Sequence, residues 1–98
     1  MIVAIVTYRP EGLTTPKAQA LFDASIPVFE AMPGLIRKYF CFDEALGRGT
    51  SVYLWESREA AERCYGDPAF LERFRRTFGC DPTIAYAPAL LVVDGPAA

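Results

Sequence analysis

The sequence predicts a single α+β domain of the ferredoxin-like type, with the element order βαββαβ. Three observations lead to this fold class. The length of 98 residues fits one domain, and the 52% of residues that are hydrophobic are enough to fill one core. Two helical patterns also alternate with four short β-rich runs, each bounded by Gly or Pro. We therefore expect a four-stranded antiparallel sheet in the order 4-1-3-2, with both helices on one face.

The first strand and the first helix are predicted from the residues up to position 32. A β-branched run at residues 2–8 predicts a strand that ends in turn residues. Thr15 and Pro16 are typical of a helix N-cap and first turn, and apolar residues then recur at three- and four-residue spacing as far as Met32. Pro27 lies inside this helix and removes one backbone hydrogen bond, so we expect a bend there.

A β-hairpin and a broken helix follow. Alternating residues at 35–42 and 50–56 predict two strands joined by a polar loop. Ser57 is the expected N-cap of the second helix. This helix is interrupted at Gly66 and restarted by the Asp-Pro pair at residues 67–68.

The restarted segment carries one aromatic stripe, formed by Phe70, Phe74 and Phe78. Gly79 is typical of a helix C-terminus. A final strand is predicted over residues 84–93, and Pro88 within it favours an edge position because proline cannot donate to a neighbouring strand. Residues 1–98 thus form one domain.

Both faces of the predicted sheet are apolar. In the first strand Ile2, Ala4 and Val6 point to one side, and Val3 and Ile5 point to the other. Two helices can cover only one side, so the open side would leave a large apolar patch on a monomer. We therefore expect a homodimer that packs two open faces together and buries about 800 Å² or more per partner.

Composition excludes several classes of function. A net charge of −2 gives no reason to expect nucleic acid, and no apolar run is long enough for a membrane helix. Residues 1–8 lack the basic start and cleavage site of a signal peptide. Three cysteines without CxxC spacing indicate reduced, buried thiols in a cytoplasmic protein. The chain has no His and no Asn, which excludes His-based nucleophile systems, His-ligated metals and His-ligated haem. We expect neither a metal nor a cofactor.

Aromatic and basic residues supply the candidate ligand site. Arg37 and Tyr39 share a face of one strand, and Tyr53 and Trp55 share a face of the next. An aromatic wall with one Arg suits a flat, partly anionic ligand such as a phenolate. Tyr65, at the helix break, could point its hydroxyl into a cleft between helix and sheet. The alternative is that these residues are core aromatics and a surface Arg.

Three segments also resemble a known family: MPGLIRKY at residues 32–39, VYLWESREAA at 52–61 and DPAF at 67–70. They are similar to the dimeric α/β-barrel superfamily, nearest to its monooxygenase branch with the cofactor-independent, antibiotic-biosynthesis-type oxygenases. The resemblance implies a ferredoxin-like protomer, a dimer built sheet to sheet, and a pocket between the sheet and the helices of each protomer.

Haem-degrading members of that superfamily use an Asn, a Trp and a His, where this sequence has Val6, Cys64 and Phe74. The resemblance therefore does not carry haem degradation over to this chain. Instead it places these three side chains, together with Phe70, in the lining of the pocket for a small aromatic substrate.

In the cofactor-free oxygenases of the superfamily, a phenol or hydroquinone is deprotonated and then reduces O₂ itself. By resemblance, Arg37 would stabilise the phenolate, Tyr39 or Tyr65 would move the proton, and Tyr53 and Trp55 would bind the substrate. The expected function is a cofactor-independent monooxygenase of a small phenol or hydroquinone. The alternatives are a non-catalytic small-molecule-binding dimer and an isomerase or cyclase of the same architecture.

Overall fold

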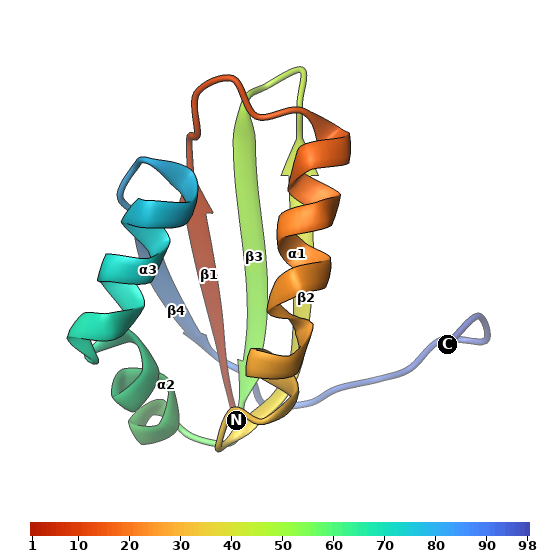
Figure 1. Ribbon diagram of the computed structural model, residues 1–98. Helices are drawn as coiled ribbons and strands as arrows, with labels where there is room; N and C mark the ends of the chain where they lie inside the picture. Colours follow the sequence, from red (N-terminus) through yellow and green to blue (C-terminus); the bar gives the residue numbers. More distant parts are fainter.

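The structure is a computed structural model that describes residues 1–98. Its elements in chain order are β1 (Ile2–Tyr8), α1 (Thr15–Glu30), β2 (Leu35–Asp43), β3 (Arg48–Trp55), α2 (Arg58–Tyr65), α3 (Pro68–Phe78) and β4 (Thr83–Pro88). The strands form one antiparallel sheet in the order β2-β3-β1-β4. All three helices lie on one face of this sheet, α1 on the β2 side and α3 on the β4 side (Figure 1). The predicted ferredoxin-like fold and strand order are confirmed.

Local capping chemistry explains where the helices begin and end. Ser57 Oγ accepts a hydrogen bond from the Ala60 amide at 3.1 Å, and Asp67 Oδ1 accepts one from the Ala69 amide at 3.0 Å. Gly79 ends α3 in the left-handed conformation, at φ 69°. The break between α2 and α3 therefore lies where the sequence predicts it.

The first helix differs from its prediction at both ends. Thr14, not Thr15, is the N-cap, because its hydroxyl accepts a hydrogen bond from the Lys17 amide. The helix ends at Glu30 instead of Met32. α1 does continue through Pro27.

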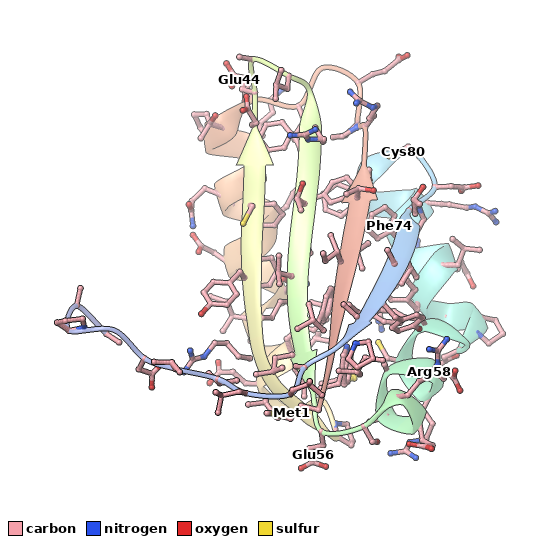
Figure 2. All side chains as sticks on the ribbon, turned by 180° about the vertical axis from the view of Figure 1, so that it is seen from behind. Met1, Glu44, Glu56, Arg58, Phe74 and Cys80 are labelled. Carbon is pink, nitrogen blue, oxygen red and sulfur yellow. The ribbon has the colours of Figure 1, made fainter.

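The last predicted strand is too long. β4 spans Thr83–Pro88, and Pro88 pairs with Ile2, the first residue of β1. Beyond one hydrogen bond from the Ala89 amide to the Met1 carbonyl, the chain leaves the sheet and runs outward past β2 (Figures 1 and 2). Leu90 and Leu91 are 93% and 78% exposed there. The apolar run at residues 90–93 has the composition of a strand, but β1 begins at Ile2 and has no further residue to pair with it.

The core lies between the sheet and the helices. Its buried residues are Ile2, Ala4, Val6, Tyr53, Trp55, Ala60, Ala61, Cys64 and Phe70. The opposite face carries no helix (Figure 2). On that open face β1 places Val3 and Ile5, and Ile5 is 37% exposed. Both faces of the sheet are therefore apolar, as the alternation predicts.

A β-bulge in β2 changes which residues share a face. Leu35 pairs with Trp55, but Arg37 pairs with Leu54, so the register shifts at Ile36. Strict alternation over the predicted strand at residues 35–42 would place Leu35 and Arg37 on the same side, and the bulge separates them. Leu35 packs against the core, whereas Arg37 lies on the open face.

The cysteines occupy three different environments. Cys64 is buried, Cys80 is half-buried and Cys41 is exposed on β2, and none forms a disulfide. The expectation that all three are buried is therefore wrong for Cys41. No helix is both long and apolar enough to cross a bilayer.

Candidate functional site

A cavity of about 270 Å³ lies between α1, α3 and the helix-covered face of the sheet. This volume is near the lower end of small-molecule pockets, about 300 Å³. Of its 16 lining residues, 11 are hydrophobic. The cavity is therefore large enough for one compact aromatic molecule, and it is lined mainly by apolar side chains.

Aromatic rings form most of its walls. Tyr8 from β1 meets Phe74 of α3 edge to face, with ring centroids 5.0 Å apart, and Phe74 lies 4.8 Å from Phe78. On the other side Phe22 of α1 lies 5.0 Å from Phe40 of β2. Phe74 and Phe78 line the cavity because the spacing of four residues along α3 puts them on one stripe. Such tilted and edge contacts hold rings in a fixed geometry.

Lys38 is the one primary amine in this aromatic lining. Its Nζ lies 3.4 Å from the ring centroid of Phe29, 3.9 Å from that of Phe40 and 4.6 Å from that of Tyr53. All three distances fall within cation–π range. None of the three ion pairs of the structure includes Lys38. The amine is therefore held by rings from α1, β2 and β3 and not by a carboxylate.

The surroundings of Lys38 favour its neutral form. Burial lowers the pKa of the ammonium group from 10.5 to about 7, and the nearby Cys64 opposes this change only in part. Near neutral pH the side chain can therefore both accept and donate a proton. Simple alternation along β2 places Lys38 on the same face as Phe40 and Phe42, so a lone lysine in an aromatic row is the sequence signal for this position.

Tyr8 also belongs to the cavity lining, and its side chain ends in a hydroxyl group. It is buried and makes no hydrogen bond. Burial raises its pKa to about 12. Gly49, opposite Tyr8 in the sheet, leaves space for this ring, because a side chain at position 49 would collide with it. The hydroxyl oxygen itself is not exposed to the cavity.

Three predicted substrate-binding residues line the cavity: Tyr53, Phe70 and Phe74. The other three, Val6, Cys64 and Trp55, belong to the packed core and are not part of the lining. Any contact between these core side chains and a ligand in the cavity is therefore indirect. The residues that pack next to them, and not these three, line the cavity.

Tyr65 does not line the cavity either. Its hydroxyl accepts a hydrogen bond from Trp55 Nε1 at 3.1 Å, and its ring packs against Phe70. Burial raises the pKa of Tyr65. The predicted orientation into a ligand cleft is therefore wrong for this cavity, because the hydroxyl satisfies the otherwise buried indole N–H.

Arg37 and Tyr39 lie on the open face of the sheet. The Arg37 guanidinium donates a hydrogen bond to the Tyr39 hydroxyl at 3.3 Å, and Tyr39 is 52% exposed. In the register of β2 and β3, Lys38 pairs with Tyr53, so Lys38 shares a face with it and Tyr39 does not. The single wall expected from Arg37, Tyr39, Tyr53 and Trp55 therefore does not form. The sheet separates the first two from the last two.

The cavity also contains a cation from α3, since Arg73 is part of its lining. Together with Lys38 it gives the apolar space two basic groups. No group of three or more His, Cys, Asp or Glu side chains is placed to hold a metal ion. The arrangement is suited to an aromatic ligand that carries or develops negative charge.

The sequence matches no protein-family model and no curated protein. Solved structures are similar in fold. SnoaB, a cofactor-independent oxygenase from Streptomyces nogalater, is 14% identical with a TM-score of 0.70, over 96% of this chain and 97% of that one. The monooxygenase ActVA-Orf6 of Streptomyces coelicolor, in complex with nanaomycin D, is 15% identical with a TM-score of 0.66, over 96% and 92%.

A third similar structure is a variant of MhuD with two manganese protoporphyrins bound per active site. It is 20% identical with a TM-score of 0.70, over 97% of this chain and all of that one. The likeness in every case extends over nearly the whole of both chains. This protein therefore shares the ferredoxin-like fold of these solved structures.

Proposed function

We propose that this protein is a cofactor-independent monooxygenase that oxidises a small phenol or hydroquinone inside the cavity between α1, α3 and the sheet. The observation that carries the proposal is the cavity itself, which is lined by aromatic rings and contains two basic side chains. Ring walls bind a flat substrate, and nearby positive charge stabilises its phenolate. The names of two similar structures, a cofactor-independent oxygenase and a monooxygenase holding nanaomycin D, support the same reaction class.

The reaction needs no external reductant, because the substrate supplies the electrons. A phenol and one O₂ give a quinone and one water: one oxygen atom enters the ring and the other leaves as water. In this cavity the aromatic rings pack against the substrate, and Arg73 of the lining stabilises the developing charge. The roles predicted for Arg37 and Tyr39 would require a separate ligand position on the open face.

Oxygen uptake tests this proposal. The purified protein is mixed with a panel of benzene and naphthalene hydroquinones in metal-free buffer, and uptake is measured with an oxygen electrode. The variant Ala24→Trp places an indole at a cavity-lining position of α1, and we expect it to lower the rate at least about tenfold, equivalent to 1.4 kcal/mol or more. Ala20→Trp makes the same change at an exposed position outside the cavity and should keep the wild-type rate.

Two results would count against the monooxygenase. Binding of the hydroquinones without any oxygen uptake would favour a non-catalytic binding protein. Equal uptake by both tryptophan variants would mean that the reaction does not take place in this cavity.

We further propose that two copies pair through their open sheet faces. Val3 and Ile5 of β1, with Val52 and Leu54 of β3, form an apolar surface that no helix covers (Figure 2). Burying such a surface against a second copy removes it from water. The three free cysteines support a cytoplasmic location for this assembly.

Light scattering coupled to gel filtration tests the dimer. At micromolar concentration we expect twice the mass of the 10.8 kDa chain. Ile5→Lys should shift the protein to the monomer, because it places a charge in the middle of the proposed interface. Gln19→Lys adds the same charge on the exposed surface of α1 and should leave the dimer intact. A wild-type monomer would contradict the proposal.

A further inference from the structure

We propose that Lys38 is the proton acceptor for the phenol substrate, so that the bound ligand is a phenolate facing a lysine ammonium. This inference rests on the proposed function, but its test does not depend on oxygen chemistry. It adds a catalytic residue that the sequence prediction did not include.

The position of Lys38 comes from the strands. Lys38 and Tyr53 are paired neighbours in β2 and β3, on the face that the helices cover. Phe29 of α1 closes over the amine at 3.4 Å. A phenol that stacks among these rings therefore brings its hydroxyl within the same enclosure as Nζ.

No carboxylate competes for the amine. The titratable groups that face the enclosure are Tyr53 from β3, Tyr8 from β1 and Arg73 from α3, with Cys64 of α2 acting on Lys38 from the core. α1 contributes none to the lining. The two tyrosines have raised pKa values because they are buried, so they stay neutral and do not replace a substrate anion. A phenolate would be the natural counter-ion of the Lys38 ammonium.

The proton transfer balances without any other reactant. The phenol O–H bond breaks, an N–H bond forms on Lys38, and the pair becomes phenolate and ammonium with no change in total charge. After the phenolate has added O₂, the same ammonium can return its proton to the peroxide, which gives a ring hydroperoxide. Loss of the ring C–H proton and of hydroxide then releases water and the quinone. Lys38 ends the cycle as the neutral amine.

The probe for this step is 2-naphthol, bound without oxygen at about pH 8, where Lys38 is largely neutral and a naphthol in water is still protonated. Its absorption spectrum reports whether the bound form is naphthol or naphtholate. Calorimetry in two buffers of different ionisation enthalpy reports whether binding releases a proton. We expect wild type to bind naphtholate with no proton released, because the proton moves to Lys38.

Two variants separate proton acceptance from simple charge attraction. Lys38→Met should bind neutral naphthol, since it has no acceptor. Lys38→Arg keeps a positive charge but cannot accept a proton, so it should bind naphtholate and release a proton to the buffer. Thermal melts of both variants check that they are folded.

The proposal is overturned if wild type binds neutral naphthol, releases a proton as Lys38→Arg does, or does not bind 2-naphthol at all. Its failure is distinguishable from failure of the proposed function. Naphtholate formation without oxygen uptake from any hydroquinone would leave Lys38 as a proton acceptor in a protein that is not an oxygenase. Oxygen uptake that is unchanged in Lys38→Met would leave the protein an oxygenase but would show that Lys38 is not its proton acceptor.

Discussion

At the scale of single residues, two polar side chains of the cavity lining are buried at a cost in folding free energy. The Lys38 amine lies among aromatic rings, and the buried Tyr8 hydroxyl makes no hydrogen bond. Stability alone would favour apolar residues at both positions. Polar groups held in this way are typical of a binding or catalytic site.

The cost at Lys38 predicts how stability changes with pH. The folded-state pKa of about 7 lies below the ordinary 10.5, so between these values the unfolded chain binds a proton that the folded chain does not. Stability therefore rises with pH across this window. Below it the ammonium is buried and the penalty is complete; above it both states carry the neutral amine and the penalty disappears.

Chemical denaturation of wild type and Lys38→Met at several pH values measures the effect. The free energy of unfolding of wild type relative to the variant should rise by on the order of 4 kcal/mol from pH 7 to 10.5. Lys17→Met removes an exposed lysine of α1. The difference in free energy of unfolding between wild type and this variant should not rise across the same pH range. A flat difference across the window would contradict the burial of the Lys38 amine.

At the scale of elements, local signals were enough for most of the fold. The break between α2 and α3 was predictable because Gly66 and Asp67 act within one turn of the chain. β1 was predictable at both ends for the same reason, since β-branched residues run directly into turn residues. Such short-range chemistry does not depend on what else packs nearby.

Two elements could not be predicted in this way, because their outcome depends on a partner strand. The apolar run after Pro88 has the composition of a strand but pairs with nothing in the sheet. The bulge at Ile36 changes the facing of Leu35 alone, and only the register with β3 reveals it. The pairing of strands that are distant in sequence cannot be predicted from the alternation of apolar and polar residues within one segment.

At the scale of the whole molecule, the two faces of the sheet have different surroundings. The helix-covered face holds the cavity with Lys38, whereas the open face holds the Arg37–Tyr39 pair and an uncovered apolar surface. The sequence predicted that both faces were apolar and that a pocket lay under the helices. The sequence predicted that Arg37 shares a wall with Tyr53, but in the register of β2 with β3 it is Lys38, one position later, that shares a face with Tyr53.

The central claim is that the cavity under the helices, and not the open face, holds the aromatic ligand. Nuclear Overhauser effects between the ring protons of 2-naphthol and the methyl groups of the protein test it most directly. We expect contacts to Leu21 and Val28, which line the cavity. Contacts to Ile5 and Leu54 of the open face in their place, or no contact to any cavity methyl group, would contradict it.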